Sequence, residues 1–369
     1  MAASNASKSL TRKDEAWVIV VIVLIVAVFL LADWWAFSTQ PNNSQTVTVT
    51  SFPYGVAYDS ENGEVFIANN NLSTVSVVSD TNNSVVDTVQ VGDSPLGVVY
   101  DSSQDEMFVA NNDSNNVSVI SGDTDDLVAS VNVGSGPSGV AFDSGKGEVF
   151  VANSYSNNVS VINDTTNSVV SNINVGSSPV AVAYDPAKSE IFVANFGSDD
   201  VSVVNDSTNR VVATVDVGSS PSGLACDSGK SEIFVANHVS NNASVINDSS
   251  NTVAATVNVG LSPTGVAYDG GKGEVFVTNL GSDTTSVISD ATDSVVATVG
   301  VGFSPYGLAY DSGKGEVFVT NEASSNASVI SDASNKVVAT VSLSTTESSS
   351  GSTSGDSDTY VASYSRPSY

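Results

Sequence analysis

Acidic side chains that could perform acid–base chemistry recur in this sequence at one fixed spacing. Seven units of 42 residues each begin with a proline, followed six positions later by an Asp and eleven positions later by a Glu. The Asp series runs from Asp59 to Asp311, and the Glu series from Glu64 to Glu316. A general acid and a general base need unlike environments, whereas a repeat makes environments alike. We therefore expect the Asp to cap turn amides and the Glu to sit at a solvated strand start, with no catalytic residues and no enzymatic activity.

Lysines occupy the turn between these two carboxylates in five units, at Lys146, Lys188, Lys230, Lys272 and Lys314. We expect a basic ring whose main role is to relieve repulsion between neighbouring carboxylates. Docking of an acidic glycan or a neighbouring protein on this ring is the alternative interpretation.

Metal and redox chemistry has few candidate side chains here. His238 and Cys226 are the single residues of their types, which excludes an internal disulfide, a Cys-rich zinc site and multi-His metal centres. Cys226 takes a slot held elsewhere by Tyr or Phe, so we expect a partly buried filler. No metal site or cofactor is predicted. Calcium stays possible because Asn163-Asp164, Asn205-Asp206 and Asn247-Asp248 offer oxygen ligands, although no spacing resembles a dedicated calcium loop.

The elements that must position these side chains are short strands. In the sixth unit, Gly265–Tyr268, Glu274–Thr278, Ser286–Ile288 and Val295–Val299 are rich in Val, Ile, Phe and Tyr and are separated by Gly, Asn, Asp and Ser. Four antiparallel strands per repeat match one propeller blade, and radial closure removes exposed sheet edges. Residues 46–343 are therefore predicted to form an all-β, seven-bladed β-propeller of four-stranded blades. The unit starts are Pro53, Pro95, Pro137, Pro179, Pro221, Pro263 and Pro305.

Two segments compete for the outermost position of the last blade. Thr46–Val49 matches the fourth-strand pattern that precedes each later proline, and Val337–Leu343 matches it too. We predict that the N-terminal strand completes the blade of residues 305–331 and clasps the ring. Residues 337–343 would then compete with it or add a fifth strand.

The N-terminus carries an apolar stretch of membrane-spanning length. Residues 16–32 contain no charge, Trp34 and Trp35 follow, and Lys8, Arg12 and Lys13 precede the stretch. We predict a cytoplasmic N-terminus (1–15), a transmembrane signal-anchor helix (16–37) and a linker (38–45), which places the propeller outside the cell membrane. A signal peptide cleaved near Ala36-Phe37-Ser38 is the alternative. Residues 344–369 are a Ser/Thr-rich low-complexity tail that we expect to be disordered or stalk-like.

Charge and sequons agree with an exterior location. The net charge of −29 argues against nucleic acid as a partner. Asn-x-Ser/Thr sequons are frequent, as a glycoprotein requires and as an Asn- and Ser-rich composition also produces. The candidate glycosylation sites are Asn42, Asn71, Asn82, Asn112, Asn116, Asn158, Asn163, Asn205, Asn242, Asn247 and Asn326.

Departures from the repeat mark a candidate binding face. Loops that follow each second strand and precede each first strand should share one side of the propeller, where apolar side chains grouped near the channel mouth would form a binding surface. The candidates are Tyr54, Tyr155, Phe196, His238, Phe303 and Tyr306. His238 taken alone is expected to be a loop residue and not a base.

The second-strand motifs identify a family resemblance. Phe234-Val-Ala-Asn237, Phe276-Val-Thr-Asn279 and Phe318-Val-Thr-Asn321, together with the Ser-Val-Ile third strand and the turn Asp206-Ser-Thr-Asn209, resemble the YVTN β-propeller repeats of archaeal surface-layer proteins. Phe stands where that family has its first Tyr. The resemblance covers about residues 46–343. It implies a seven-bladed propeller at the cell surface with adhesion or surface-layer roles, and it supplies no catalytic residues.

The predicted function is a non-enzymatic interaction or scaffold protein of the cell surface. Its partners would be the membrane, through the N-terminal helix, and other surface proteins or glycans; the oligomeric state stays open. The alternatives are an accessory or sensor subunit that docks onto a membrane complex, and a lactonase-like propeller enzyme, since fold alone does not decide function.

Overall fold

The computed structural model describes residues 45–349. The predicted segments 1–15 and 16–37, residues 38–44 of the linker and residues 350–369 of the tail lie outside the described residues. Within the described part of the chain, no helix is long and apolar enough to cross a membrane.

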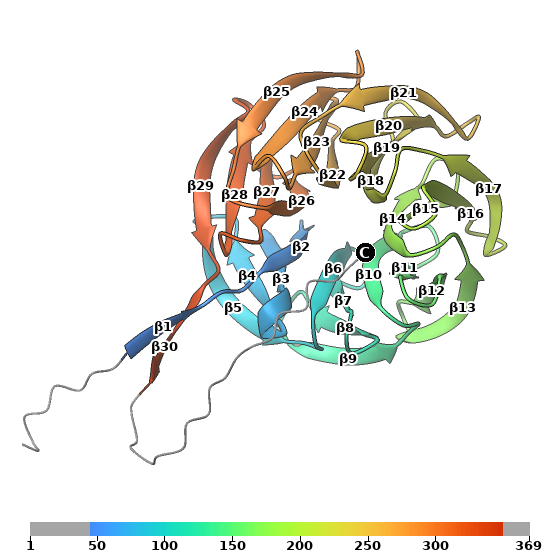
Figure 1. Ribbon diagram of the computed structural model, residues 1–369. Coiled ribbons are helices and arrows are strands. Elements are labelled where there is room, and N and C mark those ends of the chain that lie inside the picture. The colour runs from blue at the N-terminus through green and yellow to red at the C-terminus, as the bar shows by residue number, and fades with distance from the viewer. Residues whose placement is uncertain (1–44, 350–369) are drawn as a thin grey trace, which may run out of the picture. The chain divides into compact units, whose positions relative to one another are not determined.

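Seven antiparallel sheets of four strands each form the ring of a β-propeller, which confirms the predicted fold (Figure 1). In each sheet the first strand lies beside the central channel and the fourth lies at the periphery. Blades 1 and 2 consist of β2 (Pro53–Asp59), β3 (Glu64–Asn69), β4 (Thr74–Ser79), β5 (Ser84–Gln90), β6 (Pro95–Asp101), β7 (Glu106–Asn111), β8 (Asn116–Ser121) and β9 (Leu127–Asn132). Blades 3 and 4 consist of β10 (Pro137–Asp143), β11 (Glu148–Asn153), β12 (Asn158–Asn163), β13 (Ser168–Asn174), β14 (Pro179–Asp185), β15 (Glu190–Asn195), β16 (Asp200–Asn205) and β17 (Arg210–Asp216). Blades 5 to 7 consist of β18 (Pro221–Asp227), β19 (Glu232–Asn237), β20 (Asn242–Asn247), β21 (Thr252–Asn258), β22 (Pro263–Asp269), β23 (Glu274–Asn279), β24 (Thr284–Ser289), β25 (Ser294–Gly300), β26 (Pro305–Asp311), β27 (Glu316–Asn321), β28 (Asn326–Ser331) and β29 (Lys336–Ser342).

Burial changes from the second to the fourth strand of a blade. Phe150, Val151 and Ala152 of β11 are all 0 % exposed, because a middle strand is covered by the neighbouring blade on each face. A strand covered on both faces has a continuous run of apolar residues, whereas a strand with one solvent-exposed face alternates apolar and polar residues. In the outer strand β25 only Val299 is buried, while Val296 is 53 % exposed.

The hydrophobic core lies between blades. Seven clusters each combine apolar side chains of two adjacent blades, as where Phe150 of blade 3 packs with Val193 of blade 4. Because no blade covers its own two faces, each is stabilised by its neighbours, and the ring must close.

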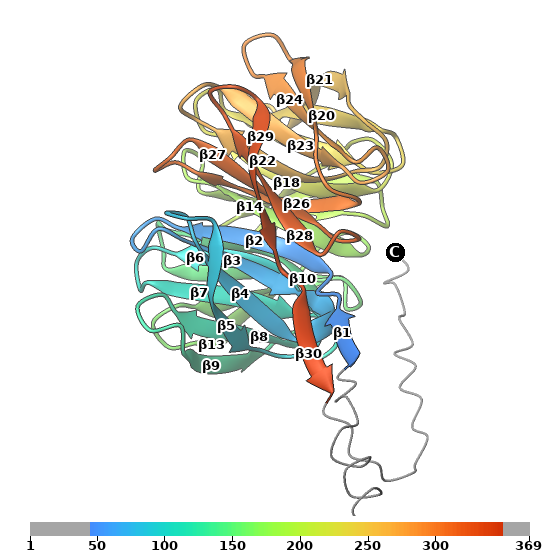
Figure 2. The ribbon, with the colours of Figure 1, turned by 90° about the vertical axis from the view of Figure 1, so that its left-hand side faces the viewer.

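Ring closure differs from the prediction. Blade 7 takes all four strands from one repeat, with β29 paired to β28, so the N-terminal strand does not complete it. β1 (Gln45–Val49) instead pairs with β30 (Thr345–Ser349) in a separate two-stranded sheet (Figure 2). Residues 345–349 of the predicted disordered tail are therefore a strand, and Gln45 of the predicted linker begins one.

Side-chain packing closes the ring between blades 1 and 7. Val56 and Ile67 of blade 1 pack with Phe318, Val341 and Leu343 of blade 7. Leu343 is 3 % exposed and Val341 is 2 % exposed, so the segment that was predicted to compete for the outer position is part of this core. β29 takes the outermost position of blade 7 because a tight turn joins it directly to β28. In that position Val341 and Leu343 are placed in the shared core.

Candidate functional site

The repeated Asp after each first strand is a buried turn cap. Asp59, Asp143 and Asp311 are all 0 % exposed. Asp143 Oδ1 accepts a hydrogen bond of 2.9 Å from the Gly145 amide, and Asp311 Oδ1 accepts one of 2.8 Å from the Gly313 amide. This confirms the predicted capping role, since a carboxylate satisfies turn amides that have no strand partner.

A second series of carboxylates, three of which the sequence offered only as candidate calcium ligands, faces the first from the next blade. The third strand ends beside an Asp in six blades, at Asp80, Asp164, Asp206, Asp248, Asp290 and Asp332. Asp185 and Asp248 lie close enough across the blade 4–5 interface that burial and their mutual interaction raise the pKa of Asp185. Six of the seven interfaces between blades therefore hold an Asp from each series.

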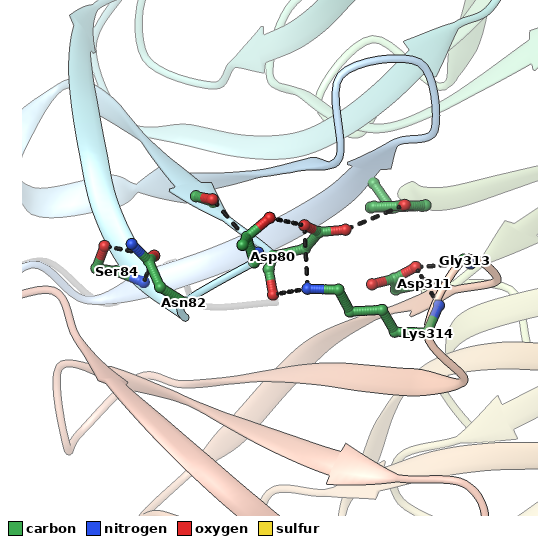
Figure 3. Close-up of polar contacts among 9 residues, drawn as sticks. Asp80, Asn82, Ser84, Asp311, Gly313 and Lys314 are labelled. Atoms are coloured by element: carbon green, nitrogen blue, oxygen red, sulfur yellow. Dashed lines mark hydrogen bonds and ion pairs between the residues drawn. The ribbon is translucent and has the colours of Figure 1, made fainter.

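The predicted lysine ring neutralises these pairs. The Lys314 ammonium lies 3.2 Å from Asp80 Oδ1 of the next blade and also donates to the Asp80 carbonyl, with Asp311 beside it (Figure 3). The other four lysines pair with the next blade's Asp at 3.5 to 4.0 Å. Their side chains are 32–37 % exposed, so each ion pair sits at the edge of the interface and not in open solvent.

A tyrosine hydroxyl adds a donor at most interfaces. Tyr58 donates to Asp80 Oδ2 at 3.4 Å, and burial together with the charge of Asp311 raises its pKa. A Cβ added to Gly313 would lie 2.9 Å from this hydroxyl. The glycine at this turn position therefore makes room for the tyrosine of the next blade.

Two interfaces have neither that tyrosine nor the glycine. Phe142 and Cys226 stand at the tyrosine position, and Ser103 and Ala187 at the glycine position of the preceding blades. The blade 1–2 interface keeps Tyr100 but has Glu61 at the glycine position. The Ser103 hydroxyl donates to Asp164 Oδ2 at 2.9 Å, replacing the donor that a phenylalanine cannot supply.

Cys226 is half-buried among apolar neighbours, as predicted. Burial and the nearby carboxylates Asp185 and Asp248 raise the pKa of its thiol to about 12. The thiol therefore stays protonated at physiological pH, so it is a packing residue and not a nucleophile.

The repeated Glu begins each second strand, as predicted, but it is half-buried and not fully solvated. One carboxylate oxygen is buried without a hydrogen-bond partner in Glu106, Glu148, Glu232, Glu274 and Glu316. Burial and the repulsion of Asp125 raise the pKa of Glu64 to about 7. These glutamates are half-buried, with one carboxylate oxygen shielded from water and the rest of the side chain partly exposed.

The motif asparagine that ends each second strand is structural. Asn153 is 0 % exposed, and its Nδ2 donates to Asn158 Oδ1 at 2.8 Å and to Ser160 Oγ at 3.0 Å. A Cβ on Gly134 would lie 2.6 Å from the Asn153 amide carbon, so the glycine before each first strand admits this side chain. The asparagine therefore ties the second strand to the third within a blade.

The central channel holds a cavity of about 170 Å³ lined by the first strands. Its hydroxyls are occupied by the next blade: Ser138 Oγ donates to the Val180 carbonyl at 3.0 Å, and Thr264 Oγ1 to the Tyr306 carbonyl at 3.0 Å. Among the lining residues there is no Asp, Glu, His, Lys or Cys. Tyr306 is the one titratable side chain among these lining residues.

The six candidate binding residues do not form one exposed patch. Tyr54 is only 3 % exposed, and its ring centroid lies 4.4 Å from that of Tyr306 at the junction of blades 1 and 7. Phe196 and His238 are half-buried neighbours with centroids 6.3 Å apart. Tyr155 and Phe303 are open to solvent, at 61 % and 66 % exposure.

Two further exposed side chains occupy the same loops. Val239 is 61 % exposed and Leu261 is 57 % exposed. Val239 takes the same repeat position as Tyr155, and Leu261 the same position as Phe303. The hydrogen bond from the Val239 amide to the Ser219 carbonyl joins the two kinds of loop, as predicted, on one side that we call the loop face.

The predicted glycosylation sites differ in exposure. Asn71 and Asn82 are exposed, whereas Asn112 is 5 % exposed and donates to the Pro137 carbonyl at 3.1 Å. Asn42 lies outside the described residues. The half-buried candidates are Asn116, Asn158, Asn163, Asn205, Asn242, Asn247 and Asn326.

These features define a seven-bladed β-propeller with polar, carboxylate-bearing blade interfaces. No protein-family model and no curated protein matches the chain. Among solved structures, it is similar to hydrazine synthase of Kuenenia stuttgartiensis, with a TM-score of 0.70 and 18 % identity over 79 % of this chain and 99 % of that one.

Two other solved structures are similar over most of the propeller. A functionally unknown protein from Desulfotomaculum acetoxidans has a TM-score of 0.66 and 16 % identity, over 76 % of this chain and 98 % of that one. A streptogramin B lyase has a TM-score of 0.64 and 11 % identity, over 75 % of this chain and 95 % of that one. Identities this low establish the shared fold alone.

Proposed function

We propose that this chain is a non-enzymatic, membrane-anchored interaction protein of the cell surface whose loop face contacts another surface protein or a glycan. The observation that carries the proposal is that four exposed apolar side chains stand at two repeat positions of the loop face. Val239, Leu261 and Phe303 belong to the loops of blades 5, 6 and 7, and Tyr155 to a loop of blade 3. Apolar side chains grouped on one face are typical of interaction surfaces.

The composition of the channel favours binding over catalysis. A cavity of about 170 Å³ can hold a small molecule, but its lining has no titratable group apart from Tyr306. Its serine and threonine hydroxyls donate to backbone carbonyls and have no adjacent base. A hydrolase or lyase needs such a group.

The cellular address comes from the sequence. The uncharged stretch 16–32, the basic residues before it and the resemblance to YVTN repeats support an anchored, extracellular propeller. The exposed sequons at Asn71 and Asn82 fit a glycosylated exterior.

Site-specific photo-crosslinking on intact cells tests the role of the loop face. A photo-reactive residue at position 303 should give a discrete adduct with a surface protein or glycoconjugate. The same residue at Val296, which is 53 % exposed on the outer strand β25, is the matched control. Equal labelling from both positions, or none from position 303, would contradict the proposal.

The adduct also separates the alternatives. Adducts with copies of the chain itself favour a surface lattice, and one constant heterologous partner favours an accessory subunit of a membrane complex. The fold shared with a streptogramin B lyase makes an enzyme the remaining candidate. Turnover of lactones by the purified protein, lost on substitution of Tyr306 in the channel, would overturn the non-enzymatic proposal.

A further inference from the structure

The cations of the propeller lie on the side opposite the loop face. Residues 45–349 contain seven Lys and Arg residues, and all seven stand at the turns that follow a first or a third strand. Five of them are the lysines that pair with an Asp of the next blade. Arg210 and Lys336 begin fourth strands directly after such turns. We call this side the turn face. Among the described residues the loop face therefore has no Lys or Arg.

Two aspartates of the loop face use only one carboxylate oxygen within the protein. Asp199 Oδ1 accepts a hydrogen bond of 2.7 Å from the Ser220 amide, and Asp283 Oδ1 accepts one of 2.9 Å from the Ser304 amide. Within the described residues neither carboxylate forms an ion pair, and the second oxygen of each accepts no hydrogen bond. These carboxylates therefore differ from those of the turn face, where lysines supply the counter-charge.

The negative charge of these two residues is not needed for the turn that they hold. In blade 5 Asn241 stands at the same repeat position, and its Oδ1 accepts a hydrogen bond of 2.8 Å from the Ser262 amide. The φ of Asn241 is 55°, against 59° for Asp199 and 56° for Asp283, and Asn adopts this left-handed conformation as readily as Asp. Asn157 fills the position in blade 3 in the same way. A neutral side chain thus meets both structural requirements.

Asp283 belongs to a loop that lies between two of the exposed apolar side chains. The Leu261 amide donates to Ser282 Oγ at 2.7 Å, and the Gly281 amide donates to the Leu261 carbonyl at 3.0 Å. On its other side the same loop binds the Ser304 amide through Asp283, directly after Phe303. Leu261, Asp283 and Phe303 are therefore neighbours on the loop face.

Asp199 has an equivalent place beside Val239. The Val239 amide donates to the Ser219 carbonyl at 3.2 Å, and the amide of the next residue, Ser220, donates to Asp199. The loop of Val239 is joined in turn to that of Leu261, through the bond from Ser262 to Asn241. Carboxylates and apolar side chains thus form one series over blades 4 to 7.

We propose that the loop face over blades 4 to 7 binds a basic segment of a protein partner, in which Lys or Arg side chains stand next to apolar ones. Asp199 and Asp283 pair with the cations, while Val239, Leu261 and Phe303 contact the apolar side chains. Exposed apolar groups supply contact area, and complementary charges supply specificity. A face with carboxylates and no Lys or Arg repels an acidic glycan. The inference rests on the proposed role of the loop face and specifies its partner.

Fluorescence anisotropy with short labelled peptides and the full-length chain in detergent tests the charge preference. The peptides share a Leu-Phe pair and differ only in the residues that flank it, which are lysine, glutamine or glutamate. The lysine peptide should bind about five- to twentyfold more tightly than the glutamine peptide, since each exposed ion pair contributes about two- to fivefold. The glutamate peptide should bind most weakly. Salt at about 500 mM should remove most of the preference for lysine.

The double variant Asp199→Asn with Asp283→Asn should bind the lysine and glutamine peptides equally, and it should fold, because asparagine occupies this position in other blades. Asp283→Asn creates a sequon with Thr285, so all proteins are produced in a host without N-glycosylation. Asp87→Asn on the outer strand β5 is the matched control for net charge, since Asp87 is exposed away from the loop face.

Equal binding of the lysine and glutamine peptides by wild type would overturn the inference, as would no binding of the lysine peptide at about 1 mM. An equal loss of binding in Asp87→Asn would assign the preference to the diffuse charge of −29. Binding of labelled heparin in place of the lysine peptide would assign the face to an acidic glycan. Each of these two results would also overturn the inference.

The cross-link from position 303 on intact cells separates this inference from the proposed function. The linked segment of the partner should contain Lys or Arg, and the adduct yield should fall in the double variant. A linked segment without Lys or Arg, with an unchanged yield in the double variant, would contradict the inference and leave the interaction role intact. The absence of any adduct from position 303 would contradict both.

Discussion

At the residue scale, paired exchanges preserve the chemistry of each blade interface while the sequence of the repeat varies. In blade 2, Asp105 replaces the turn glycine, and Gly122 replaces the Asp that follows the third strand. A Cβ on Gly122 would lie 2.4 Å from Asp105 Oδ1, so the two exchanges fit only together. Tyr100 donates to Asp105 Oδ1 at 2.9 Å, as Tyr58 does to Asp80 in the blade 7–1 interface. The carboxylate that accepts from the tyrosine is therefore retained, although in blade 2 it comes from the turn before the second strand and not from the end of the third strand.

One interface retains an unfavourable contact that a substitution should relieve. Burial raises the pKa of Glu106, and a hydrogen bond with Asn167 across the blade 2–3 interface offsets part of that rise. At the blade 1–2 interface the equivalent pair is Asp125 and Glu64, whose repulsion adds to burial and raises the pKa of Glu64 from 4.5 to about 7. Burial likewise raises the pKa of Asp125 to about 6.

Asp125→Asn should stabilise the protein, and more so at high pH. Between pH 4.5 and about 7 the folded state holds more protons on Glu64 than the unfolded chain, so stability falls as pH rises through this window. Above pH 7 the repulsion is fully present, and we expect Asp125→Asn to raise the melting temperature by about 1–3 °C at pH 8. Near pH 5, where Glu64 is protonated, the gain should shrink.

Thermal melts of Asp123→Asn provide the control, since Asp123 is exposed in the same turn. It removes the same formal charge without touching Glu64. A gain of the same size in both variants, or a gain that does not depend on pH, would show that net charge and not this contact is responsible.

At the scale of elements, the fourth strand of each blade is the least covered, and its few buried residues carry its attachment. In β29 and the residue after it, Val341 and Leu343 enter the core shared with blade 1, whereas Val338 is 54 % exposed. In the strand pairing, β1 is hydrogen-bonded to β30 and not to a strand of blade 7. The stability of blade 7 should therefore depend on the C-terminal strand and not on the N-terminal one.

Leu343→Ala should cost about 2–4 kcal/mol, because it removes a buried leucine from the core that closes the ring. Val338→Ala, on the exposed face of the same strand, should cost less than about 0.5 kcal/mol. Deletion of residues 45–49 should leave the denaturation midpoint of the propeller unchanged. Chemical denaturation of the three variants makes the comparison. A large loss of stability on deleting residues 45–49 would instead support the prediction that the N-terminal strand clasps the ring.

At the scale of the whole molecule, every blade is one continuous repeat, and the last interface closes as the others do. Lys314 pairs with Asp80 across it, and Thr320 Oγ1 donates to the Tyr54 carbonyl at 2.6 Å. The backbone hydrogen bonds at the two ends of the propeller are also the same as those in a connection between two consecutive blades. The Asn70 amide donates to the Phe52 carbonyl and the Leu343 amide to the Ser325 carbonyl, as Asn112 does to Ser94 and Val91 does to Ser73.

A circular permutant should therefore fold. Joining Leu343 to Ser51 through one glycine copies the three-residue connection between Val91 and Pro95, and new termini can open between Gly176 and Ser177, before blade 4. We expect a melting temperature within about 3 °C of the unpermuted propeller, since no strand is shared between repeats. A permutant that fails to fold, while an equivalent opening before blade 5 succeeds, would indicate that the blades are not equivalent.

Much of the fold followed from the repeat alone. Seven prolines at 42-residue spacing, each followed by four apolar runs, determined the number of blades, the strand order and the capping role of the Asp series. These features are local or periodic, so spacing along the chain is enough to predict them. The prediction that the loops after the second strand and before the first share one face held for the same reason.

Other features depend on which residues of different blades meet, and these only the tertiary structure decided. Asp80 and Lys314 are 234 residues apart in the chain, and no period within one blade places them together. The partial burial of the Glu series and the burial of Tyr54 likewise result from coverage by the adjacent blade. The choice of β29 over the N-terminal strand was open in the sequence, because both segments carry the same alternating pattern. Packing of Val341 and Leu343 against blade 1 decided it, since burial in a shared core depends on three-dimensional neighbours and not on strand propensity.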